Sequence, residues 1–584
     1  MRRTKIICTL GPSTEDETVL RQMMLSGMDV ARLNFSHGTH EQQKGYADTV
    51  KKLRKELNLP VALLLDTKGP EIRTGNFEHP VTLVEGNKFT LTTKTVPGTD
   101  SICSVSFAHL PAEVKTGTRI LIDDGLIELR VDSIACTEIH CTVMNGGDVS
   151  SHKSINVPGI HLSLPFISEQ DRRDIAFGVR EDFDFIAASF TRSAQDIIDL
   201  RSELEKLNCH KIRIISKIES ADGVKNIDEI IRVSDGIMVA RGDLGVEIPF
   251  EEIPIIQKKI IAKTADAGGQ VITATQMLDS MIKNPRPTRA ETTDVANAIY
   301  DGTSAIMLSG ETAAGAYPVQ AVQTMAKIAE RTETDIDYIQ RFRQRSAGIK
   351  PDVTSAISHA TCTTAHDLGA TAILTVTQSG RTARMISKFR PNCPIISGTT
   401  DPTVLRQMNL SWGVTPILVE EKNNTDELFD HVVNVAKKNR LVKDGDLVVI
   451  TAGVPLGMSG TTNLLKVQLV GNVLVSGTGA TKGAVCGNLC VCRTQDEVKT
   501  RFSNGDVLVV PETSNELLPY LKAASAIITE RDGMNSHAAI VGMALNKPVI
   551  VGANNATRIL KSGTTVTVDS TRGIVYSGEE KHPG

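Results

Sequence analysis

Eight short apolar runs, rich in Ile, Val and Leu, follow one another along the first part of the chain, and stretches with a helical period separate them. The runs are Lys5–Leu10, Met28–Leu33, Val61–Asp66, Phe183–Ser189, Ile212–Lys217, Gly236–Ala240, Gln270–Ala274 and Ala305–Ser309. Because they are nearly all apolar rather than alternating, each is predicted to be a parallel strand covered on both faces. Eight strands that each lead into a helix predict an α/β fold with a closed (β/α)8 TIM barrel.

The helical period is lost between Pro70 and about Pro165, which is too long a gap for a loop. Short strand patterns replace it, at Val81–Val84, Phe89–Thr93, Arg119–Ile122, Leu126–Val131 and Glu138–Val143. We therefore expect a small β-barrel domain inserted after the third barrel strand. Loops at the C-terminal ends of barrel strands surround the site, so this insert is placed to act as a lid.

Two further patterns follow the barrel. Strands at Ala372–Val376, Pro394–Ser397, Val414–Leu418 and Asp446–Thr451 alternate with helices, which predicts a doubly wound α/β domain. From about Gly471 the chain becomes rich in Gly, Thr and strand formers, which indicates a fourth unit. The predicted domains are 1–69 with 166–345 for the barrel, 70–165 for the lid, 346–470 for the α/β domain and 471–584 for the C-terminal extension.

Composition excludes several classes of protein. The chain has 584 residues with 64 Lys and Arg against 68 Asp and Glu, a net charge of −4, so it lacks the overall basic surface that nucleic acid requires. It contains no run of about 18 apolar residues, so no membrane-spanning segment is expected. The ten cysteines are irregularly spaced and lack the paired geometry of a zinc site. We therefore expect reduced thiols and a cytoplasmic protein.

Polar side chains stand at the ends of the fifth and sixth predicted strands, where a barrel carries its chemistry. Lys217 and Glu219 are two positions apart in extended chain, so their side chains share a face. Asp243 follows the neighbouring strand, and together with Glu219 it can converge on one hard cation such as Mg²⁺. A lysine beside them would stabilise a phosphoryl group in transfer. The alternative is an ion pair at the barrel rim.

The second and third predicted strands also end in polar runs. Four oxygen donors there, with one formal charge between them, are Asn34, Ser36, Asp66 and the Thr67 carbonyl. Such a set suits a monovalent cation better than Ca²⁺. Arg32 and Arg73 can clamp phosphates through forked hydrogen bonds. For Ser36 and His37 the alternative is a helix N-cap before Glu41.

Hydroxyl-rich segments close the barrel and open the α/β domain. Thr275 follows the seventh strand, and Ser309 follows the eighth as a candidate for either a helix cap or a proton relay. In the α/β domain a strand leads through Thr377-Gln378-Ser379-Gly380-Arg381-Thr382 into a helix. Hydroxyls, a glycine and backbone amides at a helix start form an anion cradle, with a plain strand–turn–helix cap as the alternative.

These motifs together resemble the pyruvate kinase family over residues 1 to about 470. The matching segments are Ala31–His37, Leu65–Gly75, Ile215–Glu219, Met238–Glu247, Ala274–Met281 and Met307–Thr312. The family transfers a phosphoryl group from phosphoenolpyruvate to ADP and forms pyruvate and ATP, the last step of glycolysis. The resemblance implies Mg²⁺ (or Mn²⁺) and K⁺ as cofactors and a homotetramer. It also implies an allosteric effector that is either a sugar phosphate or a nucleoside monophosphate.

The resemblance implies a role for each barrel residue. Glu219 and Asp243 would hold Mg²⁺, and Lys217 would balance the charge of the phosphoryl group. Arg32 would hold phosphate. The amides around Gly242 and Asp243 would bind the substrate carboxylate, and Thr275 would lie in or near the proton path to the pyruvate methyl group.

Three more sets follow from the resemblance. The nucleotide would be bound by Asn34, His37 and Arg73. Potassium would be bound by Asn34, Ser36, Asp66 and Thr67. The effector phosphate would be bound by Thr377, Ser379, Gly380, Arg381 and Thr382. A glutamate at the position of Glu71 goes with K⁺ dependence in this family, whereas a lysine there goes with independence.

The C-terminal extension contains Thr529–Ile540 and Lys547–Gly552, which resemble the phosphohistidine domain of phosphoenolpyruvate-utilising enzymes. His537 falls on the phosphorylated histidine. That family typically has Gly and Thr where Asp532 and Asn535 stand here, and no domain to load the histidine is apparent, so a structural role is expected. Two alternative functions are a phosphohistidine phosphotransferase acting through His537 and a non-enzymatic metabolite sensor. The complete set of barrel lysine and acids argues against the sensor.

Overall fold

The computed structural model describes residues 2–160, 162–345, 352–422, 424–453, 462–471 and 473–577. The chain divides into two compact units, of which the first contains Met1–Pro351 and Thr377–Leu418 and the second contains Asp352–Val376 and Val419–Gly584. The predicted boundary between the barrel and the α/β domain, at 345 and 346, borders residues outside the described ranges.

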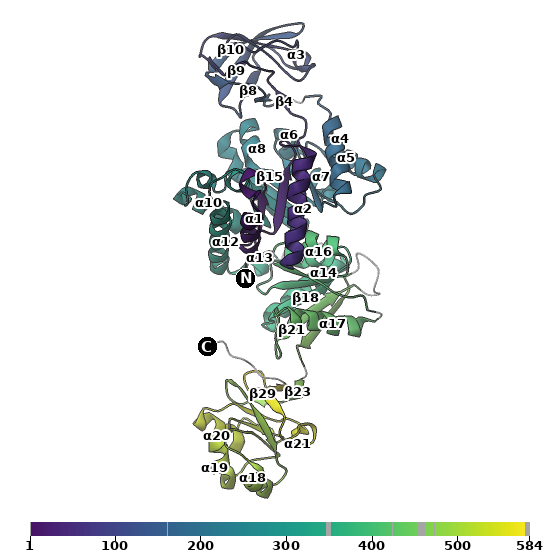
Figure 1. The fold of residues 1–584 in the computed structure, drawn as a ribbon. Coiled ribbons are helices and arrows are strands. Elements are labelled where there is room, and N and C mark those ends of the chain that lie inside the picture. The colour runs from purple at the N-terminus through teal and green to yellow at the C-terminus, as the bar shows by residue number, and fades with distance from the viewer. Residues whose placement is uncertain are drawn as a thin grey trace. The chain divides into compact units, whose positions relative to one another are not determined.

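Eight parallel strands of the first unit close into a barrel in the order β1-β17-β16-β15-β14-β13-β3-β2 (Figure 1). They are β1 (Lys5–Thr9), β2 (Val30–Asn34), β3 (Ala62–Asp66), β13 (Phe185–Ala188), β14 (Arg213–Ile218), β15 (Gly236–Ala240), β16 (Gln270–Ala274) and β17 (Ala305–Leu308). All eight predicted strands are present, so the predicted barrel is confirmed. The bounds of β15 and β16 are as predicted, and the others differ by one or two residues, as at β2, which begins at Val30 rather than Met28.

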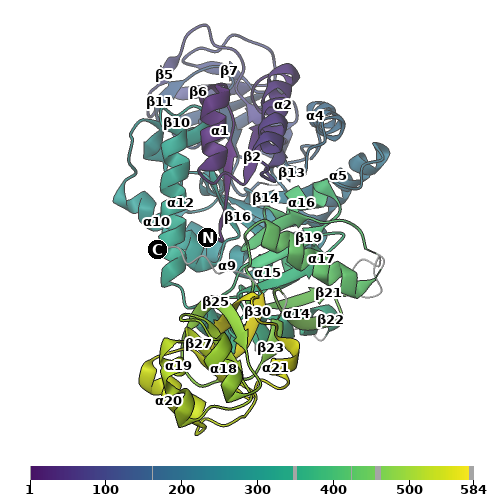
Figure 2. The ribbon, with the colours of Figure 1, turned by 60° about the horizontal axis from the view of Figure 1, so that its bottom comes forward.

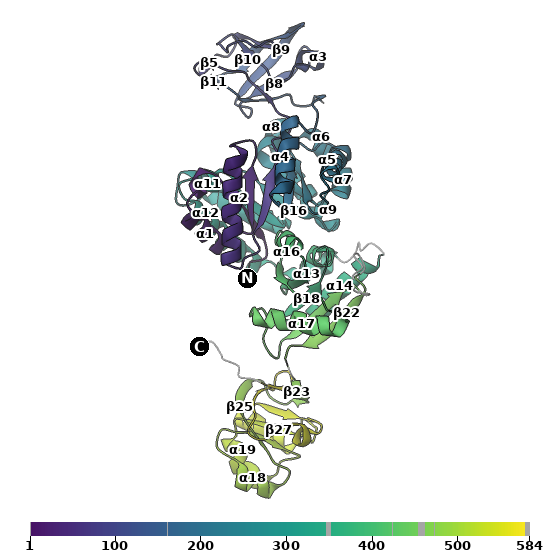
Figure 3. The same cartoon turned by 45° about the vertical axis from the view of Figure 1, so that its right-hand side comes forward.

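Helices cover the outside of this barrel (Figure 3). They are α1 (Glu17–Leu25), α2 (His40–Glu56), α4 (Glu169–Arg180), α5 (Ala194–Lys206), α6 (Ala221–Lys225), α7 (Ile227–Val233), α8 (Arg241–Glu247), α9 (Ile253–Asp266), α10 (Arg289–Asp301), α11 (Gly310–Ala313), α12 (Pro318–Asp335) and α13 (Tyr338–Arg345). Thr39 caps α2 through a capping box with Gln42. The alternative that Ser36 and His37 form the N-cap is therefore wrong.

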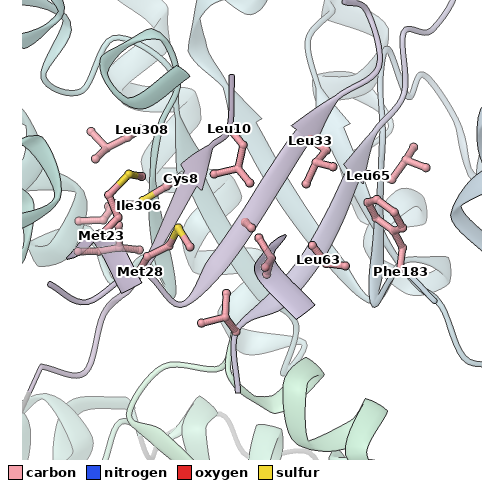
Figure 4. Packing of buried hydrophobic residues seen from close by; sticks show 14 of the residues in the cluster. Cys8, Leu10, Met23, Met28, Leu33, Leu63, Leu65, Phe183, Ile306 and Leu308 are labelled. Atoms are coloured by element: carbon pink, nitrogen blue, oxygen red, sulfur yellow. The ribbon is translucent and has the colours of Figure 1, made fainter. Parts of the chain in front are cut away.

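Successive apolar residues of the barrel strands alternate between two apolar clusters, which is why the strand sequences are mostly apolar. Ile7 and Leu64 pack inside the barrel. Cys8, Leu63 and Leu65 point outward, into the layer between strands and helices (Figure 4). Burying each side chain of this size stabilises the fold by roughly 1.5–3 kcal/mol, so both layers hold the strand ends in place.

The segment between β3 and β13 is a β insert, as predicted, and its strands form two sheets rather than the closed small barrel that was expected. Its elements are β4 (Ile72–Arg73), β5 (Val81–Leu83), β6 (Lys88–Thr92), β7 (Ile102–Ser104), α3 (Leu110–Glu113), β8 (Arg119–Ile122), β9 (Ile127–Ala135), β10 (Glu138–Asn145), β11 (Gly147–Val149) and β12 (Ser154–Asn156). Seven strands form a sheet in the order β4-β12-β8-β9-β10-β6-β7, and β11 pairs with β5. Phe89, Leu91 and Ile120 belong to the insert's own core.

The α/β region contributes elements to both units. The first unit contains α15 (Arg381–Lys388), β19 (Ile395–Thr399), α16 (Pro402–Met408) and β20 (Val414–Leu418), with β19 and β20 parallel. The second contains α14 (Val353–Asp367), β18 (Ala372–Val376), α17 (Thr425–Lys438), β21 (Leu447–Ala452) and β22 (Leu464–Leu469). β18 pairs with β21 in parallel, and β22 adds to β21 antiparallel. We did not predict β22, because its Leu-Lys-Val-Gln-Leu sequence lacks the continuous apolar run of a buried strand.

The rest of the second unit is an eight-stranded sheet in the order β23-β30-β29-β25-β26-β27-β28-β24, with helices beside it (Figure 2). Its strands are β23 (Val473–Ser476), β24 (Thr478–Gly479), β25 (Ala484–Val491), β26 (Val507–Val510), β27 (Ala526–Thr529), β28 (Val549–Val551), β29 (Thr565–Asp569) and β30 (Ile574–Ser577). Its helices are α18 (Gln495–Arg501), α19 (Leu518–Ala523), α20 (His537–Leu545) and α21 (Ala556–Ile559). Across the described part of the chain, we find no helix with the length and apolarity needed to cross a bilayer.

Candidate active site

Lys217 lies among carboxylates where β14 ends. Its Nζ is 2.9 Å from Oε1 of Glu219 and donates to Oδ1 of Asp66 at 3.0 Å. All three residues are buried, with Lys217 at 8% and Glu219 and Asp66 at 1% exposure. Burial on its own lowers the pKa of Lys217, but the carboxylates of Asp66 and Glu219 outweigh it and raise the pKa above its ordinary value. The ammonium therefore stays charged although the residue is buried.

Glu219 and Asp243 share one side of this lysine. Burial raises the pKa of Glu219 to about 7, with Lys217 acting in the opposite direction and the Asp243 carboxylate adding to the rise. Burial likewise raises the pKa of Asp243, with Lys217 acting in the opposite direction. The second oxygen of Glu219 accepts a hydrogen bond from the Phe190 amide at 2.6 Å. Two adjacent buried acids are hard to ionise together, and a cation between them would remove that repulsion.

These two carboxylates fit a small divalent cation. Both are oxygen donors, and they come from the ends of the neighbouring strands β14 and β15. In the part of the chain that the structure describes, no group of three or more His, Cys, Asp and Glu side chains gathers as a metal cage. A protein that offers only two carboxylates leaves coordination positions to water and substrate oxygens, which is how Mg²⁺ is usually bound.

The predicted monovalent-cation donors come from the ends of β2 and β3, where Asn34 and Asp66 are register partners. Asn34 Oδ1 accepts a hydrogen bond from the Ser36 amide at 3.1 Å. The Asp66 carboxylate accepts from Arg32 Nε at 2.6 Å as well as from Lys217, and these two cations lower its pKa against the effect of burial. The Thr67 carbonyl lies one residue further on. The negative charge of Asp66 is already offset by Arg32 and Lys217, and the other donors are neutral. Such a set of oxygens fits a monovalent cation such as K⁺.

Ser189 is a site residue that the sequence analysis missed. It follows β13 and is 2% exposed. Its hydroxyl accepts from Lys217 Nζ at 2.8 Å and lies 3.1 Å from Asp66 Oδ1 and 2.6 Å from the Thr67 carbonyl. The rule applied to the other strands, a polar residue directly after a buried strand, also selects this serine.

A cleft of about 660 Å³ opens at this end of the barrel. The predicted residues that line it are Arg32, Asn34, Ser36, His37, Glu71, Arg73, Lys217, Glu219 and Asp243. Asp123, Asp124 and Lys153 line it from the insert. Arg73 Nε donates to Glu71 at 2.7 Å, so a carboxylate and a guanidinium face the cleft as a pair.

Thr275 and Gly242 lie beside each other, although neither lines the cleft. The Gly242 amide donates to Oγ1 of Thr275 at 2.8 Å. Ser309 stands before α11 but makes no capping hydrogen bond, so the cap alternative is wrong for its side chain. Its hydroxyl is buried and, among the described residues, finds no hydrogen-bond partner.

The predicted anion cradle surrounds the start of α15. Gly380 is the N-cap residue with φ of 73°, and no side chain caps the helix. The amide of Thr377 donates to the Gly398 carbonyl at 3.0 Å, and the Ser379 carbonyl accepts from Arg213 Nη2 at 2.8 Å. Arg381 is the first helical residue and is exposed. The segment therefore presents a left-handed glycine and an exposed guanidinium at a helix start.

His537 is the first residue of α20. Its Nδ1 lies 2.9 Å from the Thr513 hydroxyl and its Nε2 lies 3.0 Å from Oδ1 of Asn515. Because a side-chain amide oxygen only accepts, Nε2 carries the proton and Nδ1 accepts from the threonine. Both ring nitrogens are thus engaged by neutral groups.

Comparisons with known proteins agree with the resemblance. Residues 1–322 match the family "Pyruvate kinase, barrel domain", residues 355–468 match "Pyruvate kinase, alpha/beta domain", and residues 502–573 match "PEP-utilising enzyme, mobile domain". The chain is 49% identical over 580 residues to pyruvate kinase of Geobacillus stearothermophilus and 47% identical over 581 residues to that of Sporosarcina psychrophila, with 99% of both chains covered in each case. A crystal structure of a pyruvate kinase from Cryptosporidium parvum matches with a TM-score of 0.76 at 40% identity, covering 80% of this chain and 96% of that one.

Proposed function

The chain belongs to the pyruvate kinase family, and we propose that the barrel mouth is where it transfers the phosphoryl group of phosphoenolpyruvate to ADP, forming pyruvate and ATP. The observation that carries this proposal is that Lys217, Glu219 and Asp243, from the ends of adjacent strands, line one cleft, where Lys217 pairs with Glu219 at 2.9 Å. Phosphoryl transfer needs positioning and charge stabilisation more than covalent chemistry from the protein. A buried, fully charged lysine next to two acids supplies both.

Glu219 and Asp243 are the residues that would hold Mg²⁺ (or Mn²⁺), a cofactor that the family generally uses. When bound, the ion neutralises charge on the phosphoryl oxygens. Lys217 stabilises negative charge on the phosphoryl group, because its ammonium is held in place by Asp66, Ser189 and Glu219 and needs no reorganisation. Arg32, held by Asp66 and Thr9, presents its remaining donors to phosphate.

The substrate's other end is bound at the start of α8. The amides around Gly242 and Asp243 are donors for the carboxylate of phosphoenolpyruvate. Thr275, whose hydroxyl already contacts Gly242, lies in or near the proton path to the enolate. His37, Asn34 and Arg73 face the nucleotide from the cleft wall.

Asn34, Ser36, Asp66 and the Thr67 carbonyl are the proposed K⁺ ligands. Asp66 links this site to the phosphoryl-transfer lysine, since one carboxylate contacts both Lys217 and Arg32. Glu71 supports a K⁺ requirement, because it places negative charge beside Arg73 where a lysine would add positive charge.

The start of α15 is the proposed effector site, with Thr377, Ser379, Gly380, Arg381 and Thr382 around a phosphate. Its effector is a sugar phosphate or a nucleoside monophosphate. We also propose a cytoplasmic homotetramer, because an effector site in a symmetric assembly can act on the neighbouring subunits. Cys8, Cys103 and Cys490 are buried thiols, in keeping with a reducing compartment.

The same proposal includes the domain boundaries predicted from the sequence and a structural role for the C-terminal extension. Residues 471–584 serve a structural role, because His537 is hydrogen-bonded to neutral neighbours on both sides.

A coupled assay tests the proposed function. Purified full-length protein is given phosphoenolpyruvate and ADP, and ATP and pyruvate are both measured, with and without Mg²⁺, K⁺, AMP and ribose 5-phosphate. Equal amounts of ATP and pyruvate that depend on Mg²⁺ and K⁺ are expected. Absence of ATP formation under all these conditions would contradict the proposal.

A further inference from the structure

The turn that follows β16 has a strained backbone. Thr275 and Gln276 have φ values of 68° and 54°, in the left-handed region that a β-branched residue such as threonine rarely adopts. Such a conformation persists only where surrounding contacts enforce it. Because Thr275 is placed in the proposed proton path, the contacts that enforce this turn bear directly on the reaction.

Arg241 makes those contacts. Its guanidinium donates to the Thr275 carbonyl at 2.7 Å and, at longer range, to the carbonyls of Ala274 at 3.3 Å and Gln276 at 3.4 Å. The same Nη2 atom lies 2.9 Å from the sulfur of Met277. A planar guanidinium can span successive carbonyls in this way, whereas a compact ammonium cannot.

Asp294 on α10 holds this guanidinium in turn. Nη1 of Arg241 pairs with Oδ1 of Asp294 at 2.7 Å, and the arginine side chain is only 11% exposed. Arg241 is also the first residue of α8, the short helix that carries Asp243. The pair therefore ties the turn that bears the Thr275 hydroxyl to the helix that bears a proposed metal ligand.

We propose that Arg241, held by Asp294, is a positioning residue for protonation of enolpyruvate, an inference that rests on the proposed function. In that step carbon 3 gains a proton from solvent through the Thr275 hydroxyl. The electron pair of the C2–C3 double bond forms the new C–H bond, and a lone pair of the enolate oxygen, which loses its negative charge, forms the C=O bond of the ketone. Loosening Arg241 displaces the hydroxyl and slows this step, while the contacts of Lys217 with the phosphoryl group remain.

Asp294→Asn and Arg241→Lys test the proposal, with two rates measured on each full-length variant. One is ATP formation in a single turnover by chemical quench, and the other is exchange of the pyruvate methyl protons with D₂O in the presence of Mg²⁺, K⁺ and ATP, followed by NMR. A displacement of about 1 Å at a reacting group costs about 100-fold, so exchange should fall between about 10- and 100-fold. Single-turnover ATP formation should fall far less, and the solvent deuterium isotope effect on kcat should rise.

Arg241→Lys retains the charge but cannot span the carbonyls, so it should show the same selective loss of exchange. It tests the proposal even if Asp294→Asn does not fold. Asp228→Asn is the matched control, because it breaks an exposed ion pair with Lys263 between two other barrel helices. Both rates should be unchanged in that control. Equal loss of both rates in folded variants, or loss of neither, would overturn this inference. A wild-type protein that forms no ATP would contradict the proposed function instead.

Discussion

The barrel mouth and the N-terminus of α20 each match a phosphoryl-transfer motif, yet their surroundings differ. In the barrel, Lys217 and Glu219 are buried at 8% and 1% exposure and offset each other's charge at 2.9 Å. In the extension, His537 is half-buried, and its ring nitrogens contact the neutral side chains of Thr513 and Asn515. A phosphoryl group carries negative charge that must be stabilised where it moves.

The difference shows that a motif indicates chemistry only when its surroundings supply the complementary charges. The barrel mouth offers an ammonium, a guanidinium and a pair of acids suited to a cation. The start of α20 offers a hydroxyl and an amide. Asp532, five residues before His537, would add negative charge to any phosphoryl group placed there.

Replacing the lysine should produce the largest difference between the two regions. Lys217→Met removes the charge that faces the phosphoryl group, so kcat should fall by about 1000-fold or more, the range seen when one cationic group is removed from a phosphoryl-transfer site. Binding of phosphoenolpyruvate, measured by calorimetry, should remain largely intact. Lys263→Met, in an exposed ion pair with Asp228, is the control and should behave as wild type. Unchanged turnover in Lys217→Met would remove the proposed role of this lysine.

The monovalent cation should have the next largest effect. Replacing K⁺ with tetramethylammonium should sharply depress ATP formation, because the oxygen donors around Asp66 cannot accommodate a large ion. Glu71→Lys should restore activity without K⁺ by supplying the missing positive charge. Glu78→Lys, an exposed change in the insert, is the control and should stay K⁺-dependent. Wild-type activity that is indifferent to K⁺ would show that the interpretation of Glu71 is wrong.

The pH dependence of metal binding should further distinguish the barrel mouth from the N-terminus of α20. Burial and Asp243 raise the pKa of Glu219 to about 7, so its proton competes with a divalent cation below that pH. Because the pKa of Glu219 is higher in the folded protein than in the unfolded chain, protonation of this carboxyl group stabilises the metal-free fold at low pH. This stabilisation is lost as the pH rises toward 7. The affinity for Mg²⁺, measured by calorimetry, should therefore rise between pH 5.5 and 7 and then level off. An affinity that is constant over this range would contradict the assignment.

The extension should give the smallest catalytic effect. Deleting residues after Gly471 removes β30, whose Tyr576 packs against Gly445, and Arg572, which donates to the Gly445 carbonyl. Loss of this contact should lower heat resistance, measured as residual activity after heating, while kcat before heating stays near that of the full chain. His537→Ala should leave kcat unchanged. Its content of acid-labile phosphate should equal that of the wild-type protein. Complete inactivity of a folded truncated protein would show that the extension is needed for catalysis.

The barrel could be predicted from the sequence because a strand covered on both faces is mostly apolar rather than alternating, and the eight runs have that character. The convergence of Glu219 and Asp243 was predictable as well, since successive parallel strands end at one edge. Ser189 was missed because the fourth strand was expected to run through Ser189, whereas β13 ends at Ala188 and leaves the serine as the first polar residue after it. The Arg241–Asp294 pair could not be foreseen, because it joins residues 53 positions apart through side-chain orientation alone.

Binding of Mn²⁺, followed by electron paramagnetic resonance, tests the central claim that the acids beside Lys217 gather a divalent cation at the barrel mouth. Wild-type protein should bind Mn²⁺, and Glu219→Gln should lose that binding. Glu247→Gln should retain it, because Glu247 lines the same cleft and hydrogen-bonds Asn156 rather than Lys217. Undiminished Mn²⁺ binding by a folded Glu219→Gln protein would contradict the account.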